Sequence, residues 1–270
     1  MTEVTEVVAF TGFNDERISS ETRKGLEDMG FKEPTPIQVA TLPILLGDDT
    51  DFIGLAATGT GKTAAFGIPL IEKIDPKIRA TQALVLCPTR ELAKQVAEQL
   101  EKMGKHKQIR TLTIYGGSGY RRQIEGLKAG AHIVVATPGR LVDHIEQGIA
   151  ALSKIKVVVL DEADEMISMG FKEDLERILK ATHPQDETQT GAIRAACKTW
   201  LFSATMSSDV RRVADRYLAS PKQVAINKKD MLSGTVKQVY YTTKFDSKNE
   251  VLCRILDTIE DSTWEDSSLQ

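Results

Sequence analysis

Two segments of the sequence combine residue types that handle phosphate groups. The first is AATGTGKT at 56–63, in which glycines alternate with hydroxyl residues before Lys62. Glycines allow successive backbone N–H groups to point inward, and these donors, with the start of a following helix, can cradle phosphate oxygens. Lys62 would reach the terminal phosphates, and the Thr63 hydroxyl would coordinate Mg²⁺. The general pattern has glycine where Ala56 stands, so an incidental glycine turn is the alternative.

The second segment, VVVLDEAD at 157–164, ends an apolar run in acidic residues. Asp161 can bind Mg²⁺ through water, while its neighbour Glu162 polarises an attacking water. An acidic helix start, which the helix dipole favours, is the alternative explanation. Because a phosphate loop precedes these carboxylates in the same chain, the two segments together predict a nucleotide site with hydrolytic residues.

Composition and charge indicate a globular protein and argue against a membrane or secreted one. The 270 residues are 41% hydrophobic and 27% charged, as in a globular protein of one large or two ordinary domains. No apolar run approaches the roughly 20 residues of a membrane helix, and the N-terminus lacks a signal-peptide pattern. We therefore expect a cytoplasmic protein, or a nuclear one in a eukaryote, without a membrane partner. The net charge of −3 implies that any nucleic-acid backbone is held by a local patch.

The three cysteines, Cys87, Cys197 and Cys253, are scattered without CxxC spacing. This arrangement argues against a zinc site or a disulfide framework. We expect small buried or half-buried thiols in a reducing compartment.

The residues around the two phosphate-handling segments predict an α/β fold. Short β-branched runs alternate with helical stretches, and the runs are apolar throughout, as in a parallel sheet covered by helices on both faces. These runs are DFIGLA, QALVLCP, RTLTIY, AHIVVATP, KVVVLDEAD and TWLFSAT. In open parallel sheets, ligands bind beyond the carboxyl ends of the strands. The expected functional segments are therefore 56–63, 88–90, 116–119, 137–140, 161–164 and 203–205.

The two ends of the chain have weaker patterns. In residues 14–38, apolar or small residues recur at helical spacing. Gly30 and two prolines predict the end of one helix and the start of the next. The polar stretch 183–192 predicts an exposed loop. Beyond Pro221 the pattern thins to one strand-like run, VKQVYYTT, and one helix whose apolar face is made of Val251, Leu252, Ile255, Leu256 and Ile259.

Taken in order, eight elements of the chain resemble one family, the DEAD-box RNA helicases of superfamily 2, which are built on RecA-like α/β lobes. These elements are Phe13, GFKEPTPIQ, AATGTGKT, PTRELA, GG, TPGR, DEAD and SAT. The resemblance covers about residues 13–225. The family commonly has alanine at the first phosphate-loop position, so Ala56 fits its pattern.

The resemblance implies a role for each matching position around ATP and Mg²⁺. Gln38 would read the adenine edge, and Phe13 and Phe31 would line the base pocket, with core packing as their alternative. Asp161 and Thr63 would hold the metal, and Glu162 would orient or deprotonate the hydrolytic water. The residues implied at the phosphates are Thr58, Gly59, Thr60, Gly61, Lys62 and Thr63.

The resemblance also implies a link from nucleotide to RNA. Ser203 and Thr205 would hydrogen-bond to the acidic segment, with Asp164 as their partner, so that nucleotide state reaches the RNA face. The alternative for these two hydroxyl residues is a plain turn. The RNA-binding positions would be Pro88, Thr89, Arg90, Gly116, Gly117, Thr137, Gly139 and Arg140.

These RNA-binding positions combine small residues, which let a sugar-phosphate chain approach, with arginines that bind phosphate. Such contacts do not read bases, and they imply a clamp on single-stranded or duplex RNA. A plain turn at 116–119 and an ion pair of Arg90 with an acidic neighbour are the alternatives. Arg121 and Arg122 match no motif, and we expect them on a solvated helix face.

The family uses two RecA-like lobes, and the second supplies an HRxGRxxR segment that does not occur in this sequence. We expect residues 1–225 to form the ATP- and RNA-binding lobe, and residues 226–270 to be a linker with the first strand and helix of an incomplete second lobe. Those last elements could instead add to the first lobe, exchange with a neighbouring molecule or stay disordered. We favour a piece of a longer chain, which alone would bind nucleotide weakly and hydrolyse it poorly.

Two other functions are compatible with parts of the pattern. A non-catalytic RNA-binding or scaffold protein would explain the missing second lobe, but it would not need Glu162. A DNA helicase or another phosphate-loop NTPase would seldom combine the upstream Gln38 motif with PTRELA and SAT.

Overall fold

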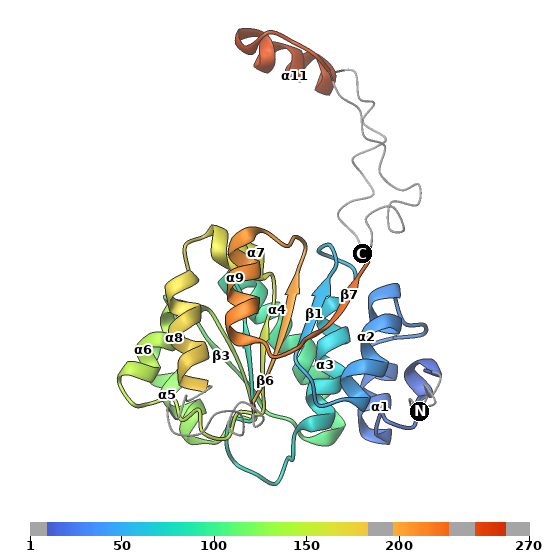
Figure 1. Cartoon of the computed structure of the whole chain (residues 1–270), viewed down its shortest axis with the longest axis vertical. Coiled ribbons are helices and arrows are strands. Elements are labelled where there is room, and N and C mark those ends of the chain that lie inside the picture. Colours follow the sequence, from blue (N-terminus) through green and yellow to red (C-terminus); the bar gives the residue numbers. More distant parts are fainter. Residues whose placement is uncertain (1–9, 183–196, 227–240, 258–270) are drawn as a thin grey trace. The chain divides into compact units, whose positions relative to one another are not determined.

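The computed structural model describes residues 10–182, 197–226 and 241–257 (Figure 1). The chain divides into two compact units, residues 1–228 and 229–270. The expected loop at 183–192 and most of the expected strand VKQVYYTT lie outside the described residues. None of the described helices is long and apolar enough to cross a bilayer.

The larger unit is built on one parallel sheet of seven strands, which confirms the predicted α/β fold (Figure 1). The strand order is β3-β4-β2-β5-β6-β1-β7, and neighbouring strands are parallel throughout. The strands are β1 (Phe52–Leu55), β2 (Ala83–Leu86), β3 (Thr111–Ile114), β4 (Ile133–Ala136), β5 (Val157–Leu160), β6 (Lys198–Ser203) and β7 (Lys222–Ala225). The first six coincide with the six predicted runs.

Helices cover both faces of this sheet because successive strand residues point to opposite sides. In β2, Val85 belongs to one core cluster, whereas Leu84 and Leu86 belong to the other. The first face is covered by α1 (Ser20–Asp28), α2 (Pro36–Gly47), α3 (Lys62–Lys73) and α4 (Arg90–Met103). The second is covered by α5 (Tyr120–Lys128), α6 (Pro138–Glu146), α7 (Ala163–Ser168), α8 (Lys172–Thr182) and α9 (Ser208–Tyr217).

The first helices end and begin where the sequence predicts. Gly30 has φ +74°, a left-handed conformation that terminates α1, and α2 starts at Pro36. Two short 3₁₀ turns, η1 (Gly12–Asn14) and η2 (Lys105–Lys107), complete this side of the fold.

Strand β7 was not predicted, because its residues KQVA are mostly exposed and form no apolar run. It pairs with β1 at the sheet edge, and Lys222 N–H donates to the Asp51 carbonyl at 3.0 Å. The buried Asp51 carboxylate also accepts backbone N–H bonds from Thr199 at 2.7 Å and Ala219 at 2.5 Å. One buried side chain therefore joins β6 and the segment that leads into β7 to the start of β1.

In the smaller unit, the described residues include the turn η4 (Phe245–Ser247) and the helix α11 (Lys248–Asp257). The helix contains four of the five residues of the predicted apolar face, and Ile259 lies outside the described residues. Leu252 and Leu256 are 55% and 46% exposed. Cys253 is also exposed, so the prediction of buried or half-buried thiols holds for Cys87 and Cys197 and is wrong for Cys253.

An ion pair near the N-terminus leads to a prediction about acid stability. The Arg17 Nε and Nη2 atoms each lie 2.7 Å from an oxygen of the buried Asp15 carboxylate, which also accepts the backbone N–H groups of Thr11 and Arg17. These bonds, with the Arg17 side chain first among them, lower the pKa of Asp15 from 3.8 to about 2. A carboxyl whose pKa is lowered by folding stabilises the protein above its unfolded-state pKa and loses that contribution as pH falls through the folded-state value.

We therefore expect Asp15→Asn to lower the free energy of unfolding by about 2 kcal/mol at neutral pH. The difference from the wild type should shrink progressively below about pH 4. Urea unfolding of both proteins over a pH series measures this, with Glu16→Gln at the exposed neighbouring position as the control. A difference that stayed constant with pH would contradict the assigned role of the ion pair.

Candidate functional site

The six segments expected to carry function all follow the carboxyl ends of strands, so they lie at the same end of the parallel sheet. The strand order sorts them into two groups. The segments after β5, β6 and β1 hold the residues expected at the nucleotide, namely 161–164, 203–205 and 56–63. The segments after β3, β4 and β2 hold those expected at RNA, namely 116–119, 137–140 and 88–90. The expected nucleotide site and the expected RNA surface are therefore neighbours at the carboxyl end of the sheet.

The segment 56–63 is a tight loop between β1 and α3. Gly59 and Gly61 have φ +79° and +91°, and Gly61 caps the start of α3. The Thr60 hydroxyl donates to the Ala57 carbonyl at 2.9 Å, which closes the loop on itself. The backbone conformation and the helix start behind it are those of an anion cradle.

Residues at the start of α2 support this loop. The Gln38 amide donates from Nε2 to the Gly61 carbonyl at 3.0 Å and accepts at Oε1 from Thr35 N–H at 2.9 Å. The Thr35 hydroxyl donates to the Thr60 carbonyl at 2.8 Å. The family motifs imply no role for Thr35, although Thr followed three residues later by Gln is a known helix-start pattern. The Gln38 amide retains one N–H and one acceptor position for a further partner.

The loop leads to a prediction that separates two of its glycines. A Cβ at Gly59 would meet no atom within 4 Å, whereas one at Gly61 would lie 2.5 Å from Gln38 Nε2. Both positions carry the cost of a left-handed backbone, about 1–2 kcal/mol for alanine. Gly61→Ala should lose about 1–3 kcal/mol more than Gly59→Ala, because the Gln38 side chain must move. Urea unfolding measures the difference, and equal losses would contradict the contact.

Behind the loop, a buried cation and a buried carboxylate are unsatisfied. Lys62 and Asp161 are 6% and 3% exposed, and neither Lys62 Nζ nor Asp161 Oδ1 has a hydrogen-bond partner among the described residues. Burial raises the pKa of Asp161 to about 7; the Lys62 charge opposes this shift and the Glu162 charge adds to it. Buried polar atoms normally have partners, so this pair is suited to a ligand with both negative oxygens and a cation.

The donor set fits Mg²⁺ bound with phosphate. No cluster of three His, Cys, Asp or Glu side chains suited to a metal occurs in the described part of the chain. Mg²⁺ commonly takes one or two protein oxygens and completes its shell with water and substrate phosphates. Asp161 and the half-buried Thr63 in the first turn of α3 supply oxygens of this kind.

Glu162, which follows Asp161, has a strained backbone conformation, and its side chain contacts the loop at 56–63. Its φ of +54° is left-handed, which is uncommon for residues other than glycine and is often found at functional sites. Its Oε1 accepts a hydrogen bond from the Thr58 hydroxyl at 3.2 Å. The loop and the acidic segment are thus in direct contact through exposed Thr58.

The segment after β6 contacts the acidic segment as well. Thr205 donates to Asp164 Oδ2 from its backbone N–H at 2.9 Å and from its hydroxyl at 2.8 Å. Asp164 N–H donates to Ser203 Oγ at 3.3 Å, and that hydroxyl donates to the Thr205 carbonyl at 2.7 Å. Burial raises the pKa of Asp164, but hydrogen bonding, chiefly from Thr205, outweighs burial, and the net pKa is lowered.

The two aromatic residues expected at the base lie against each other. The rings of Phe13 and Phe31 meet edge to face with centroids 5.6 Å apart, and both side chains are partly buried against the core. Part of each ring therefore packs as the core-packing alternative implies. The rest of each side chain is exposed, whereas Gln38 is only 2% exposed.

Residues expected at RNA come together from three strands. Exposed Arg90 lies against Gly117, where a Cβ would be only 3.0 Å from Arg90 Nη1 and where φ is +81°. Thr89 caps α4 by accepting the N–H of Leu92 at 3.2 Å. Pro88 and Thr137 are less available because both are buried. A Cβ on Gly116 would meet no atom within 4 Å, and one on Gly139 would lie 3.5 Å from an Asp174 oxygen.

Arg140 is more enclosed than expected. Its side chain is 21% exposed, its Nε lies 3.5 Å from the Asp143 carboxylate, and its guanidinium lies over the Tyr120 ring at 5.3 Å. Arg121 and Arg122 are exposed on α5, as predicted.

Comparisons with known proteins agree with this geometry. The sequence profile of the DEAD/DEAH box helicase family matches residues 35–213. The chain is 48% identical over 247 residues to the DEAD-box ATP-dependent RNA helicase CshA of Geobacillus kaustophilus, covering 92% of this chain and 50% of that relative. The corresponding protein of Bacillus subtilis (strain 168) is 45% identical over 245 residues, which is 91% of this chain and 47% of the relative.

A solved structure gives the same result for the fold. The crystal structure of a DEAD box protein from the hyperthermophile Methanococcus jannaschii aligns with a TM-score of 0.75 at 36% identity, covering 92% of this chain and 63% of the other. The chain spans about half the length of the curated relatives it matches. By its matched profile, its motifs and its fold, the chain belongs to the DEAD/DEAH box helicase family.

Proposed function

We propose that this chain is the ATP- and RNA-binding half of an ATP-dependent RNA helicase that unwinds short RNA duplexes or remodels RNA–protein complexes. The observation that carries the proposal is the unsatisfied pair Lys62 and Asp161, buried behind a loop of anion-binding geometry. The similar proteins named as ATP-dependent RNA helicases support it. Since these two relatives are bacterial, we place the protein in the cytoplasm.

The proposed roles at the nucleotide belong to residues after β1 and β5 and at the start of α2. The N–H groups of the loop from Thr58 to Thr63 and the Lys62 ammonium bind the phosphates. Asp161 and Thr63 hold Mg²⁺, which when bound would neutralise phosphate charge and polarise the terminal phosphoryl group. Glu162 orients the attacking water, and the remaining donor and acceptor of Gln38 bind the adenine edge beside the two phenylalanines.

At RNA, the proposed contacts are to the sugar-phosphate backbone. Arg90 and Arg140 bind phosphates, and the glycines at 116, 117 and 139 let the strand approach. These contacts are indifferent to base sequence. The bonded group of Ser203, Thr205 and Asp164 lies beside the hydrolytic residues, and we propose that it passes the nucleotide state to the RNA surface.

We further propose that residues 226–270 belong to a second RecA-like lobe that completes the site in a longer protein. The share of the relatives that this chain spans, about half, supports this. The second lobe would bring the arginines that contact the transferring phosphate.

The proposal is tested by the chain's nucleotide affinity with and without single-stranded RNA. RNA should tighten ATP binding in the presence of the second lobe, and a DNA strand should compete poorly, because 2′-hydroxyl contacts distinguish the two polymers. In a salt series, the RNA affinity should show a shallow slope, because few cations contact the strand. RNA binding that is indifferent to nucleotide would instead support the scaffold alternative.

A further inference from the structure

One face of α6 carries three side chains that converge on Tyr120, a residue the proposed function does not use. Arg140, His144 and Gln147 are spaced i, i+4 and i+7, so they share a face of the helix and its end. The Tyr120 ring stacks on His144 at 4.6 Å and 7°, and Arg140 lies over the ring at 5.3 Å. The Tyr120 hydroxyl donates to Gln147 Oε1 at 2.6 Å.

A buried glutamine extends this group to the loop after β3. His144 is fully buried, and its Nε2 donates to Gln123 Oε1 at 2.8 Å, since an amide oxygen can only accept. Gln123 Nε2 in turn donates to the Tyr115 carbonyl at 3.0 Å and to the Ser118 hydroxyl. These two acceptors bracket Gly116 and Gly117. One buried amide therefore holds both ends of the glycine pair.

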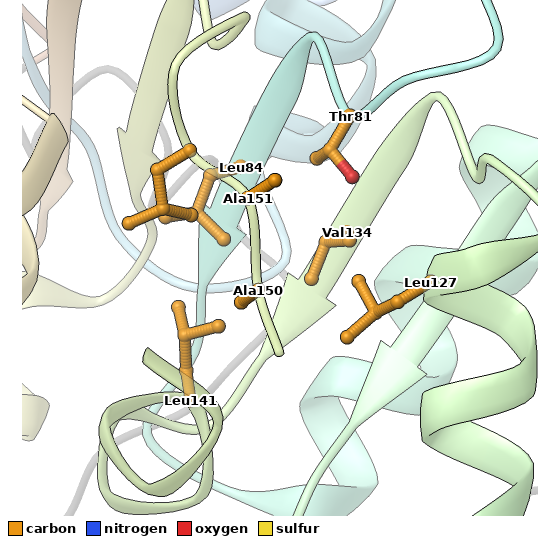
Figure 2. Close-up of a pocket in the computed structure, with 8 residues that line it drawn as sticks. Thr81, Leu84, Leu127, Val134, Leu141, Ala150 and Ala151 are labelled. Carbon is orange, nitrogen blue, oxygen red and sulfur yellow. The ribbon is translucent and has the colours of Figure 1, made fainter. Parts of the chain in front are cut away.

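The two helices that carry this polar group, α5 and α6, also line a cavity. A small apolar pocket lies there, lined by residues of β2, β4, both helices and the segment after α6 (Figure 2). Leu127 of α5 and Leu141 of α6 lie on different sides of it (Figure 2).

We propose that Tyr120 and Gln123 are positioning residues for RNA: Tyr120 holds the Arg140 guanidinium, and Gln123 holds the Gly116–Gly117 loop at a set distance from it. The inference rests on the proposed RNA surface. A guanidinium that lies over an aromatic ring keeps its N–H donors in its own plane, where they can bind phosphate oxygens in pairs. Because His144 contacts both residues, the two RNA-facing segments are joined into one unit.

The test measures binding of a fluorescein-labelled oligouridylate to the 270-residue chain at low salt by anisotropy. Tyr120→Ala should weaken binding about three- to tenfold, the range expected for loss of a cation–π contact. Tyr120→Phe keeps the ring and should bind like the wild type. Arg121→Ala, which removes an exposed cation of α5 outside the group, is the control for general charge effects.

A double-mutant cycle separates positioning from a general structural role. If Tyr120 acts through Arg140, Tyr120→Ala should have no further effect in an Arg140→Ala background. Losses that multiply, or an unchanged affinity of the single variant, would overturn the inference. A wild-type chain that does not bind the strand at all would instead overturn the proposed RNA surface, and the inference with it.

Gln123 is tested against another buried glutamine. Gln82 is 1% exposed and bonds the Asp75 and Ile78 carbonyls at the opposite end of β2. Gln123→Ala and Gln82→Ala should both lower the unfolding midpoint, but only Gln123→Ala should weaken RNA binding, with ADP affinity unchanged in both. Equal RNA affinity of the two variants would contradict the role of Gln123.

Discussion

Joining this chain to a second lobe that carries the HRxGRxxR segment is expected to raise its RNA-stimulated rate of ATP hydrolysis by about 10³- to 10⁵-fold. The physical reason is charge. In the proposed site, one buried ammonium, that of Lys62, would lie at the phosphates, whereas charge developing on the transferring phosphoryl group needs further cations. An arginine supplied by the second lobe would lower the activation free energy by roughly 4–7 kcal/mol, the value that corresponds to this change in rate.

The measurement is steady-state ATP turnover at saturating ATP, Mg²⁺ and RNA, for the 270-residue chain and for a two-lobed protein. A two-lobed variant with lysines in place of those arginines is the matched control, because it keeps the charge but loses the planar donors. If the 270-residue chain turned over ATP at a rate near that of the two-lobed protein, the second lobe would not be needed and this account of the mechanism would be wrong.

Substitution of Lys62 and of Glu162 is expected to separate binding from hydrolysis. Lys62→Ala should weaken ATP binding by at least about 30-fold, because it leaves the buried Asp161 carboxylate and the phosphates without their cation. Glu162→Gln should leave the affinity nearly unchanged, since an amide oxygen can still accept the Thr58 bond, but should lower the rate by about 10²–10⁴-fold.

Calorimetry of ATP binding and single-turnover hydrolysis, the latter with the second lobe present, give the two quantities. Lys73→Ala is the control for Lys62→Ala, because Lys73 ends the same helix and pairs at the surface with Asp49. Full activity in both Lys62→Ala and Glu162→Gln would refute the assigned roles. Loss of ATP binding in Glu162→Gln would show that this residue acts in binding.

Much of the fold could be predicted because its signals are local. Strands β1, β2, β4, β5 and β6 are mostly buried, largely apolar runs, whereas β3 is half-buried at the end of the strand order. The left-handed turns at Gly30, Gly59 and Gly61 favour glycine. The tight loop at 56–63 could be predicted too, because its glycines and the start of α3 are adjacent in sequence. A continuous segment carries each of these features, so spacing alone identified them.

The parts that could not be predicted depend on contacts between distant segments. The strand order separates the expected nucleotide segments from the expected RNA segments at the carboxyl end of the sheet. No single stretch of sequence determines that order. Strand β7 is polar and is held by its pairing with β1 and by the nearby bonds of Asp51. The convergence of Tyr120, Gln123 and His144 joins α5 to α6, and their sequence separations follow no motif.

The central claim is that the loop and Lys62 bind a polyphosphate, and a crystal structure of the chain soaked with ADP and Mg²⁺ tests it most directly. The account predicts the diphosphate in the curve of residues 58–63, with the Lys62 ammonium at its terminal oxygens and the adenine beside Gln38. A loop that stayed empty, or was filled by its own side chains at a saturating concentration of ADP, would contradict it.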